Sequence, residues 1–80
     1  MDIRKQVGGN LQRLRREKGW SQEALAFESG LHRTYVSGIE RGVRNPTLLI
    51  LDKLAKTFGV APAELLADKS GSSRRGRPRA

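Results

Sequence analysis

The chain has 80 residues, a length that supports one small domain but not two separate hydrophobic cores. It contains 16 Lys and Arg against 8 Asp and Glu, for a formal net charge of +8, and it has no cysteine. The lack of cysteine excludes disulfides, thiol nucleophiles and cysteine-bound metal sites. The longest apolar run, Leu48 to Leu51, is too short to span a membrane. Asp2 and Arg4 stand where the apolar segment of an export signal would begin, so we expect a cytoplasmic protein.

The ionisable side chains form no catalytic or metal-binding pattern. His32 is the single histidine, and Ser37 lies five residues beyond it, on another helical face. Gly8-Gly9 is not followed by the Gly-Lys-Ser/Thr ending of a phosphate loop. We therefore expect no enzyme activity, no metal and no cofactor. The charge indicates a polyanionic partner instead, because eleven of the sixteen cations are arginines, whose planar donors suit phosphate and guanine.

Apolar residues at helical spacing predict a first helix. They recur at intervals of four, four and three residues, on one helical face: Ile3, Val7, Leu11 and Leu14. Gly8-Gly9 interrupts this helix at a cost of about 1 kcal/mol per glycine relative to alanine, so we expect its first turns to be loose. Lys18-Gly19 ends it, since glycine favours the left-handed stop.

Two short helices with a tight corner are predicted next. Ser21 caps the first of them, which stops at Gly30. The second places three apolar residues at core spacing, Leu31, Val36 and Ile39, and ends at Arg41-Gly42. Because only Gly30-Leu31 separates the two helices, they must cross steeply, with Ala26 as the small residue at the contact. This geometry turns the opposite face of the second helix outward, where it can enter a major groove.

Two further helices and a tail complete the chain. Asn45-Pro46-Thr47 breaks and caps a fourth helix, whose inward stripe we expect to be Leu48, Leu51, Leu54/Ala55 and Phe58. Pro62 starts a short fifth helix, and no period-two pattern predicts a strand, so the fold class is all-α. Residues 70–80 contain four arginines, no acid and no large apolar residue, and they are predicted to form a disordered basic tail after a domain at 1–69.

These motifs resemble the Cro/repressor-type, XRE-like helix-turn-helix family, which includes the lambdoid phage repressors. The similarity covers residues 11–67, and its motifs are Leu14-Arg15, Ser21 to Ala26, Gly30, Ile39 to Gly42, Asn45-Pro46-Thr47, Leu54 to Lys56 and Gly59-Val60. The run from Arg33 to Arg41 is especially similar to controller proteins of restriction–modification systems. The resemblance implies a compact five-helix bundle of the lambda-repressor type, with the helix-turn-helix at about 22–41.

The resemblance also implies which residues contact the bases of DNA. They lie in the first turn of the third helix and one turn later: His32, Arg33, Thr34, Ser37 and Gly38. Arg33 is the main expected reader, because its donor fork can hold guanine O6 and N7, although a solvated surface arginine is the alternative. Gly38 departs from family members that carry a long polar residue there, and we expect it to allow close approach to the groove wall. His32 is alternatively a poor helix cap.

Contacts with phosphates are expected around the same helix, from Gln22, Tyr35, Arg41, Arg44, Asn45 and Thr47. For Arg41, a solvated charge at a helix end is an equal alternative. Arg15 and Glu40 resemble the family's buried ion pair, so their implied role is structural.

Dimerisation is expected, because a single helix reads only a few base pairs. Three apolar residues not assigned to the core are expected at the interface, Leu49, Ile50 and Leu65, with packing under the first helix as the alternative. In the tail, Arg75, Gly76, Arg77 and Pro78 resemble the centre of an AT-hook, which enters an A·T-rich minor groove. Arg74 replaces the usual leading proline, and general attraction to phosphate is the alternative.

Together these patterns predict a sequence-specific DNA-binding transcriptional regulator, a repressor or activator that binds a pseudo-palindromic operator as a homodimer and is associated with the nucleoid. RNA polymerase is a further candidate partner, through Glu23 and Glu28 of the second helix, and no membrane is involved. Two alternatives stay open. One is an antitoxin or adaptor whose helix-turn-helix mainly binds a protein, and the other is a non-specific architectural DNA-binding protein.

Overall fold

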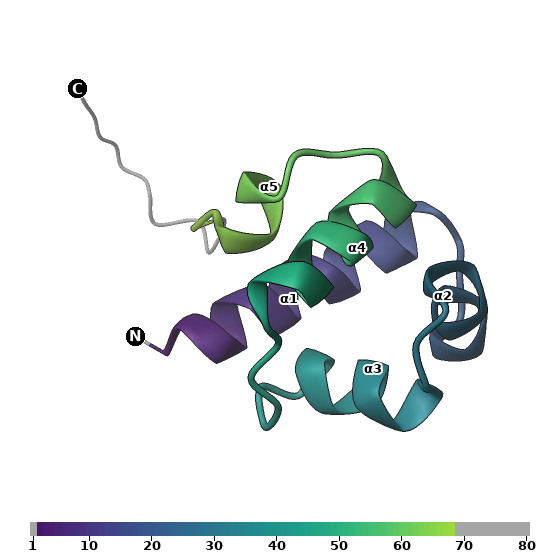
Figure 1. The fold of residues 1–80 in the computed structure, drawn as a ribbon, viewed down its shortest axis with the longest axis horizontal. Helices are drawn as coiled ribbons and strands as arrows, with labels where there is room; N and C mark the ends of the chain where they lie inside the picture. Colours follow the sequence, from purple (N-terminus) through teal and green to yellow (C-terminus); the bar gives the residue numbers. More distant parts are fainter. Residues whose placement is uncertain (1, 69–80) are drawn as a thin grey trace.

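The computed structural model describes residues 2–68, and this part of the chain consists of helices joined by short turns. The elements are α1 (Ile3–Glu17), α2 (Gln22–Ser29), α3 (Arg33–Glu40), α4 (Leu48–Phe58) and α5 (Ala63–Leu66). In Figure 1, α3 and α5 pack against α1 from opposite sides, and α4 lies in front of it. No strand occurs among residues 2–68, which confirms the all-α prediction. None of the described helices is long and apolar enough to cross a membrane. The predicted tail, including Arg75 to Pro78, lies outside the described residues.

Side-chain caps define where three of the helices begin. The Asp2 carboxylate accepts a hydrogen bond from the Arg4 amide at the start of α1. Ser21 Oγ accepts from the Ala24 amide at 3.0 Å, and Thr47 Oγ1 accepts from the Ile50 amide at 3.2 Å. Each cap satisfies a backbone donor that the first helical turn leaves unpaired. The predicted caps of α2 and α4 are therefore confirmed.

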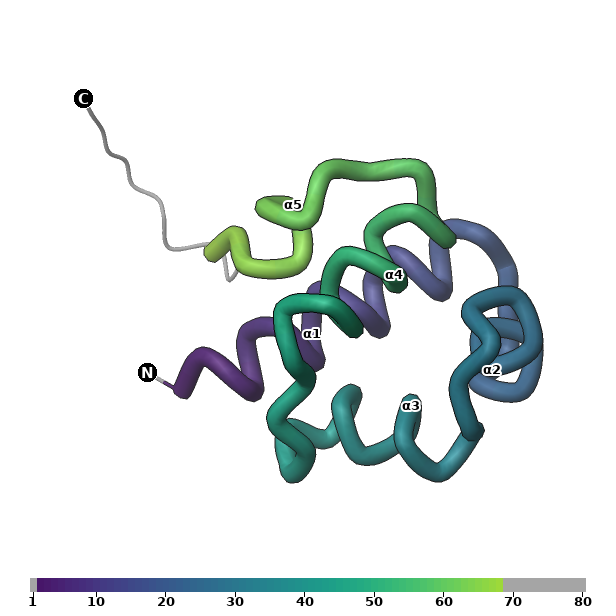
Figure 2. Tube along the Cα trace, in the orientation of Figure 1, coloured from purple at the N-terminus to yellow at the C-terminus, as the bar shows by residue number. Residues whose placement is uncertain are grey.

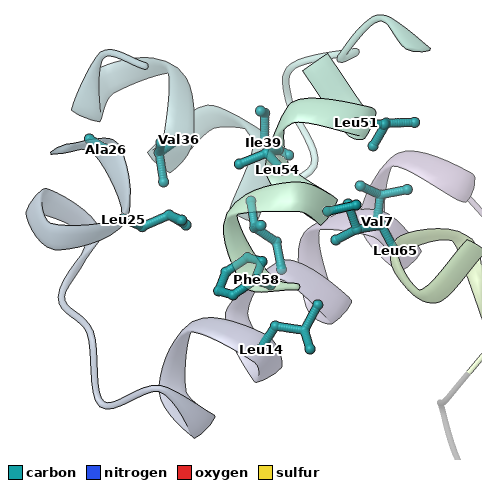
Figure 3. Close-up of a cluster of buried hydrophobic side chains, with 12 residues drawn as sticks. Val7, Leu14, Leu25, Ala26, Val36, Ile39, Leu51, Leu54, Phe58 and Leu65 are labelled. Carbon is teal, nitrogen blue, oxygen red and sulfur yellow. The ribbon is translucent and has the colours of Figure 1, made fainter. Parts of the chain in front are cut away.

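One hydrophobic core joins all five helices. Its largest fully buried side chains come from every element: Leu11, Leu25, Val36, Ile39, Leu54 and Leu65. Figure 3 shows side chains of α4 lying between those of α1 and those of the α2–α3 pair. Trp20 stacks on Phe58 with ring centroids 5.6 Å apart and closes the core next to the α1–α2 turn. Burial of a large apolar side chain contributes about 1.5–3 kcal/mol to stability. Because Val36 and Ile39 of α3 are both fully buried in this core, the core fixes the orientation of that helix.

The first turns of α1 are regular, so the prediction of loose turns at Gly8-Gly9 was wrong. Helix α1 runs without interruption from Ile3 to Glu17. Gly8 is buried, and a Cβ at this position would lie 2.6 Å from the carbonyl oxygen of Glu40. The glycine therefore lets the backbones of α1 and the end of α3 approach closely, a tertiary gain that outweighs its poor helix propensity.

The expected place of Leu65 at a dimer interface is also wrong, because its side chain is fully buried in the core. Two polar side chains of α1 hold the end of α5 in this position. Asn10 Nδ2 donates to the carbonyl oxygens of Leu65 and Ala67 at 2.8 and 2.7 Å, and Gln6 Nε2 donates to that of Leu66 at 2.6 Å. The carbonyls at the end of this short helix thus find partners inside the fold.

The inward stripe of α4 begins one turn later than expected. Leu48, which we expected in the core, is 81% exposed, whereas Ile50 is half-buried and packs against the core. The first turn of α4 extends past the edge of the core, so only the later apolar positions, Leu51, Leu54, Ala55 and Phe58, are buried.

Candidate nucleic-acid interface

The corner between α2 and α3 determines which face of α3 is exposed. Gly30 ends α2 in the left-handed conformation, with φ of 76°. Its amide and that of Leu31 both donate to the carbonyl oxygen of Ala26, at 2.9 and 3.1 Å. This closes the end of α2 within two residues and turns the chain steeply into α3 (Figure 2). The structure thus confirms the predicted corner.

The first turn of α3 points away from the core. His32, Arg33 and Thr34 are exposed and Ser37 is half-buried, while Val36 and Ile39 on the opposite face are fully buried. His32 stands at the N-cap position without a side-chain capping hydrogen bond. Four of the five expected base-reading residues therefore lie on the accessible side of this helix.

Arg33 is held by an acidic residue of the neighbouring helix. Its Nε lies 3.3 Å from Oε2 of Glu23 in the first turn of α2, and both side chains are more than half exposed. An ion pair this accessible to water contributes little to folding stability. The contact places the guanidinium of Arg33 beside the first turn of α2. Sequence reasoning missed this pair, which depends on the crossing of two helix starts.

Gly38 is covered, so the expectation that it lies open to the groove wall was wrong. By helical spacing it belongs to the exposed face, one turn after Thr34, yet it is buried. A Cβ at this position would overlap Cγ of Arg44, because the aliphatic stem of Arg44 lies directly over the glycine. The long side chain that reaches this part of the face thus comes from the turn after α3.

The expected phosphate-contacting residues fall into two groups. Arg41, Arg44, Asn45 and Thr47 are exposed around the end of α3 and the turn before α4. Two others are engaged within the fold: Tyr35 packs against the core, and Gln22 Nε2 donates to Glu40 Oε1 at 3.0 Å. The first group contains two arginines and no acidic residue, and it forms an accessible basic margin beside α3.

A buried ion pair fixes α3 to α1. Arg15 Nε donates to Glu40 Oε2 at 2.6 Å, and Nη2 donates to Oε1 at 3.1 Å. The third guanidinium nitrogen, Nη1, donates to the carbonyl oxygen of Trp20 at 2.9 Å. Only 2% of the Glu40 side chain is exposed, and its hydrogen bonds raise the pKa of Arg15 against the opposing effect of burial. The pair therefore holds the end of α3 against α1.

Gln12 strengthens the same junction and was missed from the sequence. Its Nε2 donates to the backbone carbonyl oxygen of Glu40 at 3.0 Å, one helical turn from Gly8. The sequence signal for this contact is the spacing of Gly8 and Gln12, which are four residues apart and therefore share one face of α1. On that face, a glycine that allows another backbone to approach closely lies next to a side chain that can donate a hydrogen bond to it.

Exposed apolar residues lie side by side in the first turn of α4. Leu48 and Leu49 are 81% and 82% exposed, and Ile50 beside them is half-buried. A shallow groove of about 130 Å³ lies between the starts of α1 and α4 and the end of α5. Its lining residues are Ile3, Arg4, Val7, Asn45, Pro46, Leu51 and Leu66.

Comparison with known proteins places this geometry among DNA-binding regulators. Residues 11–65 match the sequence profile described as Helix-turn-helix. An uncharacterized HTH-type transcriptional regulator of Sinorhizobium fredii is 52% identical over 66 residues, covering 82% of this chain and 86% of that protein. Control protein C.BamHI of Bacillus amyloliquefaciens is 48% identical over 66 residues, covering 81% and 82%. The tetramer of the restriction–modification controller protein C.Esp1396I, solved with its natural 35-base-pair operator, superposes with a TM-score of 0.73 at 38% identity, covering 81% and 86%. The predicted similarity to controller proteins is confirmed.

Proposed function

The chain belongs to the helix-turn-helix family, and we propose that it is a sequence-specific transcriptional regulator that binds a pseudo-palindromic operator as a homodimer. The observation that carries the proposal is the exposed first turn of α3, held away from the core by the Gly30 corner. A helix presented in this way fits the major groove of B-DNA. The controller protein whose structure contains its operator supports duplex DNA as the ligand class. No enzymatic role is proposed.

Arg33 is the proposed main reader of base edges. Its side chain is 60% exposed, and its guanidinium lies 3.3 Å from the Glu23 carboxylate of α2. A bidentate contact to guanine O6 and N7 gives about 1–3 kcal/mol of discrimination against another base. His32, Thr34 and Ser37 are the remaining proposed base contacts on the same side.

Phosphates are proposed to meet the basic margin at the end of α3, which contains Arg41, Arg44, Asn45 and Thr47. Contacts of this kind fix the register of the protein on the duplex without reading sequence. Gln22 and Tyr35 contribute from the α2–α3 unit. The side-chain amide of Gln22 donates one proton to Glu40 Oε1, and its second N–H remains to donate to a phosphate.

The apolar edge of α4 is the proposed dimer interface. Leu49 and Ile50 carry over from the sequence, and the structure adds Leu48, since it is as exposed as Leu49. Burial of such neighbouring side chains against a second copy removes apolar surface from water. Pairing of two copies by two-fold symmetry places two α3 helices about 34–36 Å apart, one turn of the duplex.

The test compares Arg33→Ala with Arg16→Ala, which removes the same charge from an exposed position on α1. Each variant is titrated with the preferred duplex of the unmodified protein and with its single-base variants. Arg33→Ala is expected to lose preference at one base position per half-site, whereas Arg16→Ala keeps the full preference. Equal weakening by both variants at all sequences would refute base reading by Arg33 and favour a non-specific architectural role.

A further inference from the structure

Gly38 and Arg44 form a contact that neither helix periodicity nor the family comparison assigns. Gly38 lies one helical turn after Thr34, on the side of α3 that is otherwise accessible. Its burial comes from Arg44, since an added Cβ would overlap Cγ of that side chain and lie 3.4 Å from its Cβ and Cδ. The aliphatic stem of Arg44 thus fills the space that a side chain at position 38 would take.

The backbone of the following turn is fixed to the same glycine. The carbonyl oxygen of Gly38 accepts hydrogen bonds from the amides of Val43 and Arg44, at 3.0 and 3.2 Å. Gly42, with φ of 78°, reverses the chain so that these two amides reach back to α3. Both the backbone and the side-chain stem of Arg44 are therefore positioned by residue 38.

We propose that Gly38 is a positioning residue whose lack of a side chain seats Arg44 along α3, so that Arg44 delivers its guanidinium to a phosphate at the end of the recognition helix. The proposal rests on the proposed function and deepens it, because it names the residue that sets the direction of one phosphate contact. In this proposal Gly38 acts through Arg44, whereas in the expectation from the sequence the glycine itself approaches the groove wall of the DNA.

Alanine at position 38, alone and combined with Arg44→Ala, separates these possibilities. Its methyl group displaces the stem of Arg44, while alanine favours the helix more than glycine does, so weaker DNA binding is not caused by an unfolded α3. Gly9→Ala is the matched control. It makes the same change in a helix at an exposed position where a Cβ meets nothing within 4 Å.

The experiment measures the affinity for the preferred duplex over a range of salt concentrations. The variants are Gly38→Ala, Arg44→Ala, their combination and Gly9→Ala, each checked for folding by circular dichroism. Loss of one phosphate contact is expected to reduce the slope of log K against log salt by about 1 and to weaken binding about tenfold at all sequences. Gly38→Ala and Arg44→Ala should show the same loss, the combination no further loss, and Gly9→Ala none.

Two results would overturn the proposal. Wild-type affinity of folded Gly38→Ala would show that Arg44 needs no seat, and multiplied losses in the combined variant would show that the methyl group itself obstructs DNA. A measurement without DNA distinguishes failure of this proposal from failure of the proposed function. In the free protein, the NMR signal of the Arg44 Nε–H should move in Gly38→Ala and stay in place in Gly9→Ala. An unmoved signal refutes the seat, whereas a moved signal with no binding of any duplex by the wild type refutes the function and with it the delivery to phosphate.

Discussion

Removal of Glu40 tests how far the interface depends on the ion pair behind it. Glu40→Ala leaves the Arg15 guanidinium without its carboxylate, and it also removes the acceptor of the Gln22 amide. Loss of one partner of a buried pair costs about 3–5 kcal/mol of unfolding free energy. Arg15 is 13% exposed and keeps its hydrogen bond to the Trp20 carbonyl, so we expect about 3 kcal/mol, the lower end of this range.

That loss is large for a domain of this size, in which about 1 kcal/mol shifts the midpoint of thermal unfolding by about 4–8 °C. Thermal and urea unfolding followed by circular dichroism should therefore show a fall in Tm of about 12–24 °C. The control is Glu17→Ala, which breaks the Arg13–Glu17 pair at 3.3 Å, whose carboxylate side chain is 61% exposed, and should cost about 0.5 kcal/mol or less. If the two variants lose equal stability, the reasoning that Arg15 and Glu40 anchor α3 is wrong.

Three further predictions concern the chain ends and the dimer. The pKa of Asp2 is lowered mainly by its side-chain hydrogen bond to Arg4, so the cap stabilises α1 above the ordinary carboxyl range and is lost as pH falls through the lowered value; a fall in the protection of the Arg4 amide, measured relative to its intrinsic exchange rate at each pH and absent in Asp2→Ala, checks this. Leu49→Lys is expected to shift sedimentation toward monomer, whereas the same charge added by Thr57→Lys on α4 should not; unchanged association of both would place the interface elsewhere. Deletion of residues 70–80 is expected to weaken binding most at operators with flanking A·T tracts, and an equal loss at all flanks in gel-shift titrations would favour general phosphate attraction.

The local signals in the sequence were sufficient for the helices and their order. Ser21 and Thr47 cap the helices that they were predicted to start, and Gly30 has the positive φ that the short corner requires. The exposed face of α3 followed from Val36 and Ile39, because two buried anchors on a short helix leave only one accessible side.

The errors arose where contacts between distant segments decide the outcome. Gly8 was interpreted by helix propensity alone, whereas its role depends on the backbone of Glu40 in another helix. Leu65 and Leu66 are adjacent in a helix of four residues, too short for periodicity to indicate which side chain is buried. Gly38 is covered by a residue six positions later, across a turn whose conformation no repeat in the sequence specifies.

The central claim is that the first turn of α3 reads base edges as part of a symmetric dimer. Selection of bound sites from a pool of random duplexes, with the full chain at moderate salt, tests it most directly. We expect an enriched sequence of two inverted half-sites whose centres lie about one helical turn apart, the spacing that two-fold pairing of α3 requires. Recovery of duplexes without any shared sequence, or of one unrepeated half-site, would contradict the account.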